Sequence, residues 1–323
     1  MRRKILMWLL VFIIFADAGL ADLSVHFLDV GQGDAALVIC DDEAMLIDGG
    51  PPSASQLVYT YLREHTQAIS VMIATHPHDD HIGGLAAALN AVPVDVIYSP
   101  VTEWDSKSWQ SLEKYADAQG TPIVVPSEGD VFSLGGATVT VLHCWPDAWT
   151  ENDMSIVVRL DYGSTSFLFT GDAEASSEYM MLDEGLEHAD VLKVGHHGSR
   201  SSSTVEFIEA VSPTYAVISC GAENQYGHPH EETLAALAGS TILRTDQLGT
   251  IVFHSDGRVL THSKAEDKTE ETTAAYIGNR NSMKFHYPDC QSVADMAEHN
   301  KVPLASREDA IALGYKPCGR CKP

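Results

Sequence analysis

Thr75-His76-Pro77-His78-Asp79-Asp80-His81 is the stretch that decides the fold. It follows a short apolar run at residues 69–74, which predicts a strand. His76 and His78 are two residues apart, so in an extended segment their side chains point the same way and can bind one metal ion. Asp80 and His81 lie in the turn that follows and can reach a second ion close by. Four ligand-type side chains within six residues therefore predict a metal site with two cations.

Predicted strands and helices alternate around this motif. The helices are expected at residues 56–64, 84–90, 106–119, 203–210 and 231–238. The strands are expected at residues 23–28, 36–40, 44–47, 69–74, 94–98, 122–125, 138–142, 155–160, 166–169, 191–194 and 215–219. This alternation, with several strand hairpins, predicts sheets covered by helices and hence an α/β fold.

Two further motifs follow predicted strands. They are Phe169-Thr170-Gly171-Asp172 and Val194-Gly195-His196-His197-Gly198-Ser199. In this order behind the first motif, they resemble the metallo-β-lactamase superfamily. The resemblance implies an αββα sandwich in which Asp172 bridges two metal ions and His196 or His197 is a further ligand.

Within that superfamily, the chain resembles the nuclease domain of ComEC-type competence proteins over roughly residues 23–260. The residues that carry this resemblance are Leu28-Asp29-Val30-Gly31-Gln32-Gly33-Asp34, Leu46-Ile47-Asp48-Gly49-Gly50, Glu151-Asn152-Asp153-Met154-Ser155, His196-His197-Gly198-Ser199 and Asn224-Gln225-Tyr226-Gly227-His228-Pro229-His230. The resemblance implies a metal-dependent phosphodiesterase that acts on DNA. Asp29 and Asp34 are expected to shape the loop beside the metals.

One position departs from the superfamily pattern. Many members have a third histidine for the first metal about twenty residues before the bridging aspartate, and here Asn152 takes that place, while His143 lies further upstream. Either Asn152 is a weak oxygen ligand, or the first metal has two histidines and Asp172. An oxygen-rich site favours Mn²⁺ or Mg²⁺ over Zn²⁺.

The implied reaction is hydrolysis by a metal-activated water. Asp80 is placed to orient that water as well as to bind metal. His228 is a candidate for contacting a phosphate oxygen or protonating the leaving group, and its alternative is a structural loop histidine. Ser202 or Ser203 is expected to cap the helix that follows.

The N-terminus predicts an export signal. Arg2, Arg3 and Lys4 precede an apolar run at residues 5–15, and Ala16-Asp17-Ala18 suits cleavage. We therefore expect a signal peptide at residues 1–21 and a secreted or cell-envelope protein without stable membrane insertion after cleavage. An uncleaved membrane anchor is the alternative. The hydrolase domain is expected at residues 22–261.

The net charge of −25 opposes tight binding of a polyanion. The charge is unevenly distributed, because residues 276–323 hold seven basic and five acidic side chains. Bound divalent metals would also reverse the sign locally at the active site.

A separate module is expected at residues 276–323, after a polar linker at residues 262–275. His286 with Cys290, and Cys318 with Cys321, form two close pairs that suit one structural Zn²⁺. A disulfide from Cys290 to Cys318 or Cys321 is the alternative. The other three cysteines, Cys40, Cys144 and Cys220, are expected to be buried free thiols.

This module resembles the metal-binding domain of the Ada DNA repair protein. The residues that carry the resemblance are Pro303-Leu304-Ala305-Ser306-Arg307-Glu308-Asp309-Ala310 and Gly314-Tyr315-Lys316-Pro317-Cys318-Gly319-Arg320-Cys321-Lys322-Pro323. His286 stands where Ada has its methyl-accepting cysteine, so methyl transfer is not expected. DNA contact is the property that could remain, through Arg280, Lys284, Arg307, Lys316, Arg320 and Lys322.

Three functions are thus open at the level of sequence. An exported DNase or phosphodiesterase is the main prediction. A hydrolase of another ester, such as phosphorylcholine, a lactone or a β-lactam, suits the acidic body. A non-catalytic DNA-binding protein is the third, and the complete metal motif opposes it. No protein partner is inferred.

Overall fold

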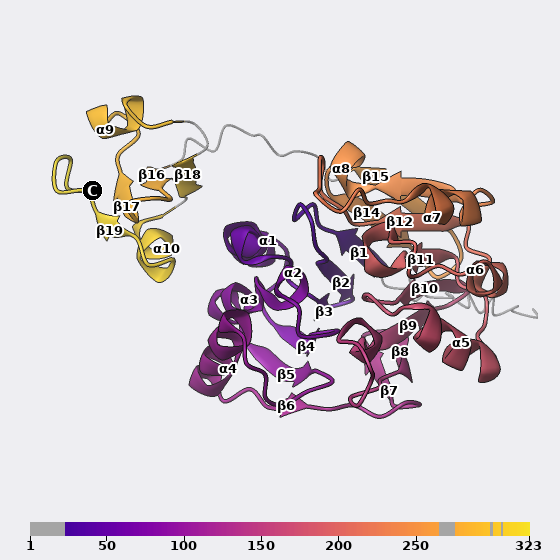
Figure 1. Cartoon of the computed structure of the whole chain (residues 1–323). Helices are drawn as coiled ribbons and strands as arrows, with labels where there is room; N and C mark the ends of the chain where they lie inside the picture. Colours follow the sequence, from indigo (N-terminus) through magenta and orange to yellow (C-terminus); the bar gives the residue numbers. More distant parts are fainter. Residues whose placement is uncertain (1–22, 265–274, 298–299, 305) are drawn as a thin grey trace, which may run out of the picture.

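The structure, a computed structural model, describes residues 23–264, 275–297, 300–304 and 306–323 of the 323-residue chain. Two β-sheets lie face to face, and helices cover the outer face of each (Figure 1). This arrangement is the predicted αββα sandwich, with a small C-terminal unit that has a sheet of its own. The predicted signal peptide at residues 1–21 lies outside the described residues. In the described part of the chain, no helix has the length and apolar character that a membrane span requires.

The first sheet has eight strands in the order β15-β14-β1-β2-β3-β4-β5-β6. From β3 to β6 the neighbours are parallel, and the remaining pairs are antiparallel. Its strands are β1 (Leu23–Phe27), β2 (Ala36–Cys40), β3 (Glu43–Ile47), β4 (Ile69–Ile73), β5 (Val94–Tyr98), β6 (Ile123–Val124), β14 (Ile251–Ser255) and β15 (Leu260–Lys264).

The second sheet has seven strands in the order β13-β12-β11-β10-β9-β8-β7. Strands β10 to β13 are parallel, and β7 to β10 form antiparallel hairpins. Its strands are β7 (Val131–Leu134), β8 (Ala137–His143), β9 (Val157–Tyr162), β10 (Thr165–Phe169), β11 (Val191–Lys193), β12 (Tyr215–Ile218) and β13 (Thr241–Arg244).

Three hydrophobic layers hold the sandwich together. The middle layer lies between the sheets, where the rings of Phe27 and Phe169 stack with centroids 5.8 Å apart. The helices α1 (Ser55–His65), α3 (Leu85–Ala91) and α4 (Lys107–Gln119) bury apolar side chains against the first sheet. The helices α5 (Ala175–Asp183), α6 (Val205–Val211) and α7 (Glu231–Ala236) do the same on the second sheet. Strands buried on both faces need apolar residues throughout, which explains runs such as the one in β4.

Short helical turns complete this domain. They are α2 (Asp79–Ile82), α8 (Thr245–Leu248) and the 3₁₀ turns η1 (Pro52–Ala54), η2 (Asn152–Met154) and η3 (Gly195–Gly198). Three of them, α2, η2 and η3, contain motif residues.

The C-terminal unit has a four-stranded sheet in the order β18-β16-β17-β19. Its elements are β16 (Tyr276–Asn279), β17 (Lys284–His286), α9 (Gln291–Ala294), β18 (Lys301–Leu304), α10 (Arg307–Ala312) and β19 (Lys316–Pro317). Phe285, Leu304 and Tyr315 belong to a separate buried cluster. A unit this small has little apolar surface to bury, so a bound metal would add needed stability.

Some boundaries differ from the sequence prediction. Strand β15 pairs with β14 as far as Lys264, so the predicted linker at 262–275 starts inside a strand. The side chains of residues 261–264 are exposed at the sheet edge, which is why no apolar pattern marks them. Helix α5 and strands β13 and β14 were not predicted either.

Candidate dinuclear metal centre

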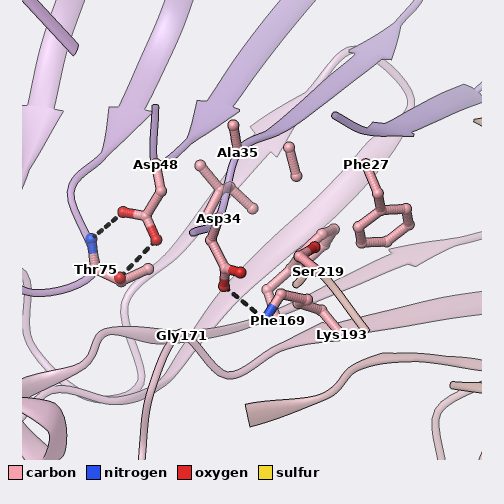
Figure 2. Close-up of a pocket in the computed structure, with 11 residues that line it drawn as sticks. Phe27, Asp34, Ala35, Asp48, Thr75, Phe169, Gly171, Lys193 and Ser219 are labelled. Carbon is pink, nitrogen blue, oxygen red and sulfur yellow. Dashed lines mark hydrogen bonds and ion pairs between the residues drawn. The ribbon is translucent and has the colours of Figure 1, made fainter. Parts of the chain in front are cut away.

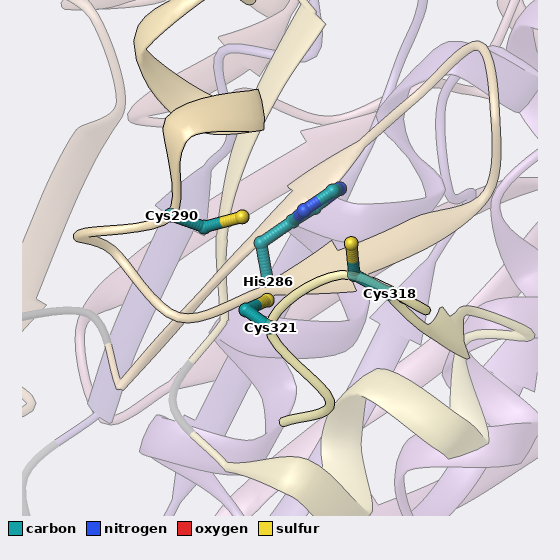
Figure 3. A group of neighbouring side chains, drawn as sticks. All are labelled: His286, Cys290, Cys318 and Cys321. Atoms are coloured by element: carbon teal, nitrogen blue, oxygen red, sulfur yellow. The ribbon is translucent and has the colours of Figure 1, made fainter.

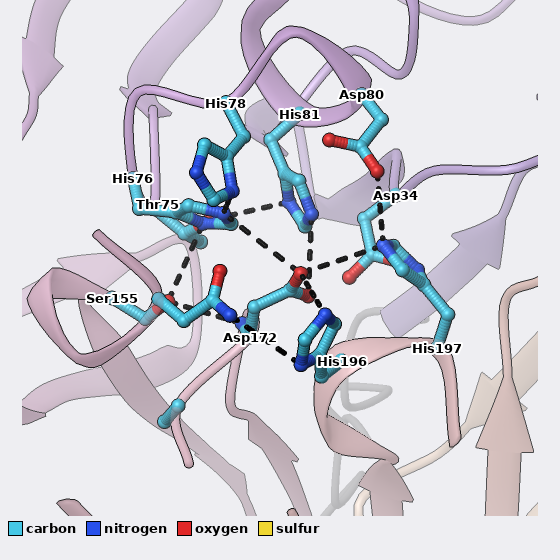
Figure 4. Close-up of polar contacts among 12 residues, drawn as sticks. Asp34, Thr75, His76, His78, Asp80, His81, Ser155, Asp172, His196 and His197 are labelled. Carbon is cyan, nitrogen blue, oxygen red and sulfur yellow. Dashed lines mark hydrogen bonds and ion pairs between the residues drawn. The ribbon is translucent and has the colours of Figure 1, made fainter. Parts of the chain in front are cut away.

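Three strand ends bring the motif residues together at one edge of the sandwich (Figure 4). Strand β4 is followed by the segment that carries His76, His78 and His81. In the second sheet, β10 is followed by Asp172, and β11 is followed by η3 with its two histidines. Side chains that follow the carboxyl ends of parallel strands meet at one edge of a sheet, where α/β proteins commonly place their sites.

The turn at α2 is fixed by close backbone contact. Gly49 N–H donates to the carbonyl oxygen of His81 at 2.7 Å. A Cβ atom on Gly84 would strike the carbonyl oxygen of Gly49. Glycine at this position thus lets the end of β3 pack directly under the histidine motif.

One group of ligand atoms contains His76, His78 and Asp172, with all atoms within 4.8 Å of one another. His76 Nε2 lies 2.9 Å from His78 Nδ1 and 3.8 Å from Asp172 Oδ2. Burial lowers the pKa of His76 well below its ordinary value, so this ring is neutral at pH 7. A neutral imidazole is the form that binds metal.

A second group contains Asp34, His81, Asp172 and His197, again within 4.8 Å. His81 Nε2 lies 3.2 Å from Asp172 Oδ1, and His197 Nε2 lies 3.5 Å from Asp172 Oδ2. Asp80 Oδ2 approaches His197 Nε2 to 3.4 Å. Asp172 therefore stands between the two groups.

The buried polar atoms at this point test whether metal fits. His81 Nε2, His197 Nε2 and Asp172 Oδ1 are buried, and within the described chain their side chains have charge contacts at 3.2–3.5 Å with one another and with Asp80 but no well-formed hydrogen bond at these atoms. Unpaired polar atoms in a protein interior cost free energy, and in native structures they point to an ion or water. Imidazole nitrogens and a shared carboxylate around such atoms suit Zn²⁺ or Mn²⁺. The donor set therefore fits two divalent cations.

His81 and His197 are each held from behind by a carboxylate. Asp48 Oδ2 lies 2.7 Å from His81 Nδ1, and Asp48 Oδ1 accepts from Thr75 N at 2.8 Å. Asp34 Oδ1 lies 3.1 Å from His197 Nδ1. Such contacts fix the tautomer and direct the opposite nitrogen, Nε2, at the metal position.

Lys193 completes the support on the Asp34 side. Its ammonium lies 2.5 Å from Asp34 Oδ2 and donates to the carbonyl oxygen of Val194 at 2.8 Å. Both oxygens of Asp34 are thereby engaged, one by Lys193 and the other by His197. Asp34, Asp48, Thr75 and Lys193 line a buried cavity of about 10 Å³, roughly the space of one water molecule (Figure 2).

The electrostatics of these pairs follow from burial and proximity. Burial acts to lower the pKa of His197, but the Asp172 and Asp34 carboxylates outweigh it and raise that pKa to about 9. Burial acts to raise the pKa of Asp34, and Lys193 and His197 outweigh it and hold the pKa below its ordinary value. For Asp48, burial prevails and raises the pKa.

The two adjacent histidines take different positions. His197 is buried in the second group, whereas His196 is partly exposed and its Nε2 lies 3.8 Å from Asp172 Oδ2. Both have left-handed backbone conformations, with φ of 48° and 54°. Non-glycine residues seldom adopt this conformation, and such strain is found mainly at functional sites.

Asn152 and His228 lie at the wall of the open side. A cleft of about 460 Å³ is lined by Asn152, His228, Trp104 and Tyr226 together with motif residues. The ring of His228 lies 5.6 Å from that of His196 and stacks on Tyr226, also at 5.6 Å. Burial lowers the pKa of His228 to about 4.

Ser202 and Ser203 do not cap α6, so that prediction was wrong. Ser202 Oγ donates to the carbonyl of Ala173, and Ser203 N donates to Glu178, so Thr204 supplies the cap instead. His143, the upstream histidine, pairs with Glu128 at 3.0 Å, apart from the two ligand groups.

Three of the six cysteines lie in the hydrolase domain. Cys40, Cys144 and Cys220 are buried free thiols, as predicted, and burial raises the pKa of the last two to about 12.

The C-terminal four, by contrast, form a cluster. Ligand atoms of His286, Cys290, Cys318 and Cys321 lie within 4.8 Å of one another, and the thiols are free (Figure 3). Three thiols and one imidazole are the donor set of a tetrahedral zinc site.

The six basic residues predicted for DNA contact are all exposed. Lys284 and Lys316 lie in register on the neighbouring strands β17 and β19. Arg280, Arg307, Arg320 and Lys322 are exposed elsewhere on the same unit.

Comparison with known proteins gives the family. Residues 28–222 match the family described as the metallo-beta-lactamase superfamily. The chain is 32% identical over 262 residues to ComE operon protein 3 of Bacillus subtilis, which covers 74% of this chain and 34% of that protein. It is 29% identical over 221 residues to Recombination protein 2 of Haemophilus influenzae, covering 66% of this chain and 26% of that protein. The chain thus spans about a third or less of the length of these relatives.

Among solved structures, the metallo-beta-lactamase fold protein YhfI from Bacillus subtilis aligns with a TM-score of 0.51 and 15% identity, over 73% of this chain and 100% of that one. This likeness concerns the fold alone. The match to the family covers more than half of the chain, and the motif residues converge in space as that family requires. The chain therefore belongs to the metallo-β-lactamase superfamily, as a metallo-hydrolase related to the ComEC-type competence proteins.

Proposed function

We propose that this protein is an exported, metal-dependent phosphodiesterase that hydrolyses DNA. The observation that carries the proposal is the position of Asp172 between two groups of ligand atoms, at the floor of a 460 Å³ cleft. Two neighbouring cations suit phosphodiester hydrolysis because they can stabilise both the attacking and the leaving oxygen. The name of one relative, Recombination protein 2, supports a nucleic-acid substrate.

Each cation has its own set of side chains in this proposal. His76, His78 and Asp172 hold the first, with Asn152 beside them. Asp80, His81, Asp172 and His197 hold the second. Bound Zn²⁺ or Mn²⁺ supplies Lewis acidity and neutralises the charge of the reacting phosphate. Of the two adjacent histidines, His197 is the proposed ligand and His196 faces the cleft.

The chain's own residues position the reactants. Asp80 is partly exposed at the cleft and is proposed to orient the attacking water. The water oxygen attacks phosphorus, and the bond from phosphorus to the leaving oxygen breaks. His228, at the rim, is proposed to contact a phosphate oxygen. Its lowered pKa leaves the ring neutral at pH 7, so the leaving oxygen takes its proton from water. Trp104 and Tyr226 offer aromatic surfaces on which bases of a single strand could stack.

The C-terminal unit, residues 276–323, is proposed to hold DNA. Its structure is stabilised in this proposal by one Zn²⁺ at His286, Cys290, Cys318 and Cys321. Its exposed basic residues supply phosphate contacts that the acidic body lacks. The export signal at residues 1–21 and a secreted or cell-envelope location belong to the same proposal.

One other function has support from a specific observation. The net charge of −25 favours a small ester over a long polyanion. A metallo-hydrolase of another ester, such as a lactone, is therefore the second candidate.

The test uses protein from which signal and metals have been removed, then supplied with Mn²⁺, Zn²⁺ or Mg²⁺. Circular and linear DNA, single- and double-stranded, are the substrates, and an Asp80→Ala, His81→Ala double variant is the control. Metal-dependent cleavage by the wild type and none by the control is the expected result. Failure to cleave any DNA with any metal contradicts the proposal, and a panel of small esters then tests the second candidate.

A further inference from the structure

Glu174 contacts Asn152 and His196, which both line the cleft beside the centre. Its Oε1 accepts from Asn152 Nδ2 at 3.1 Å and lies 3.3 Å from His196 Nδ1. The backbone N–H of Glu174 donates to Asp153 Oδ1 at 3.1 Å, which fixes the carboxylate next to the η2 turn. Glu174 is therefore held in place by the same segment that carries Asn152.

This contact determines which end of the Asn152 amide is left without a hydrogen bond. An ionised carboxylate can only accept hydrogen bonds, so it selects the NH₂ end of an amide. The other end, Oδ1, is buried and has no hydrogen-bond partner in the described chain. Asn152 also lines the cleft with His78 and Asp172. The free oxygen is thus an unsatisfied acceptor beside the first ligand group.

The η2 turn places Asn152 close to that group. Ser155, which follows the turn, has its Oγ 3.4 Å from His76 Nδ1 and accepts from Asp172 N at 3.0 Å. The turn is therefore connected to two ligands of the first cation.

We propose that Glu174 is a positioning residue that makes Asn152 an oxygen ligand of the first cation and thereby raises this position's preference for Mn²⁺ over Zn²⁺. The donor set is then two imidazoles, one carboxylate and one amide oxygen. Oxygen donors suit Mn²⁺, whereas a third imidazole would suit Zn²⁺. The inference rests on the two-cation centre of the proposed function and is independent of the substrate.

The affinities of the full chain for Mn²⁺ and Zn²⁺ test this proposal directly. Mn²⁺ binding is followed by loss of the free-ion electron paramagnetic resonance signal, and Zn²⁺ affinity by competition with a chromophoric chelator. The variants are Asn152→Ala, Asn152→His and Glu174→Gln, and the exposed Glu184→Gln is the matched control. Glutamine can both donate and accept, so it no longer selects one end of the amide.

We expect one of two Mn²⁺ ions to bind at least tenfold more weakly in Asn152→Ala and Glu174→Gln, the range typical for loss of a residue that orients a ligand. Asn152→His should raise the ratio of Zn²⁺ to Mn²⁺ affinity at least tenfold, because it supplies a third imidazole. A purely structural role would weaken both metals together in every variant. Mn²⁺ affinity within twofold of wild type in both Asn152→Ala and Glu174→Gln would overturn the inference.

A different result would overturn the proposed function as well. If the wild type binds neither metal beyond one Zn²⁺ at the C-terminal cluster, the two-cation centre is wrong. If the wild type binds two Mn²⁺ and the variants are unchanged, only the inference about Glu174 fails.

Discussion

Removing the Lys193 ammonium should destabilise the protein strongly. Lys193 is 4% exposed and its partner Asp34 is 5% exposed, with 2.5 Å between the charged atoms. A Lys193→Met substitution keeps an unbranched side chain of similar length but leaves the buried Asp34 carboxylate with His197, 3.1 Å away, as its remaining close charged partner. Breaking a buried ion pair costs about 3–5 kcal/mol when the other charge is left unpaired, and because His197 still contacts Asp34 the expected loss is at the lower end, about 3 kcal/mol. Since a whole domain has about 5–15 kcal/mol of stability, this is a large fraction of the total.

Urea unfolding of the metal-free protein, followed by tryptophan fluorescence, measures the effect. The exposed Lys107→Met is the matched control and should change the free energy of unfolding by less than about 0.5 kcal/mol. The Asp34→Asn variant removes the other charge, and the double variant removes both.

The double variant carries the decisive comparison. With both charges gone, no unpaired charge is buried, so its loss of stability should fall short of the sum of the single losses by about 2 kcal/mol or more. Additive losses, or a Lys193→Met loss below about 1 kcal/mol, would refute the reasoning that the two side chains stabilise each other.

Three further perturbations have definite expected outcomes. Burial lowers the pKa of His26 from 6.5 to about 3, so between these pH values the unfolded chain binds a proton that the folded chain does not. The free energy of unfolding should therefore fall as the pH drops from 6.5 towards 3, by up to about 4–5 kcal/mol, and denaturant titrations should show a flatter pH dependence for His26→Gln. Cys318→Ser should lower the zinc content by one equivalent and make the C-terminal unit sensitive to trypsin; unchanged zinc content would contradict the proposed zinc site. Gly84→Ala should cost about 1–3 kcal/mol in thermal or urea unfolding because its Cβ would meet the backbone of Gly49, whereas Gly239→Ala, which has open space, should not.

The sandwich could be predicted because its signals are local. Strand β4 and helix α4 have the apolar runs and terminal residues that mark such elements, including Ser106 as the cap and Gly120 in the left-handed conformation. Helix α5 gave no such signal, because it buries the polar Ser177 and Glu178 while Tyr179 is exposed. The Glu178 carboxylate accepts hydrogen bonds from the backbone N–H groups of Ser203 and Thr204. No periodicity in the sequence predicts this contact.

For the candidate site, the sequence identified the candidate ligands but not the residues that hold them in place. The ligands lie in short motifs, whereas Asp34 and His197 are 163 positions apart and meet only in the folded chain. The only sign of Lys193 in the sequence is that a charged residue stands in an otherwise apolar predicted strand. The sequence could not separate His196 from His197 or orient the Asn152 amide, because the positions of Asp172 and Glu174 beside them are seen only in the folded chain.

The candidate metal ligands come from both sheets, and this affects how long the protein survives in the cell. His76, His78 and His81 follow a strand of the first sheet, while Asp172 and His197 follow strands of the second. Cations bound among them would act as crosslinks between the two layers of the sandwich. A ligand that binds only the folded state adds about 2.7 kcal/mol at a concentration one hundred times its dissociation constant. Under metal starvation the layers would separate more readily, so that proteolysis, and not only the rate of hydrolysis, would come to depend on the metal supply.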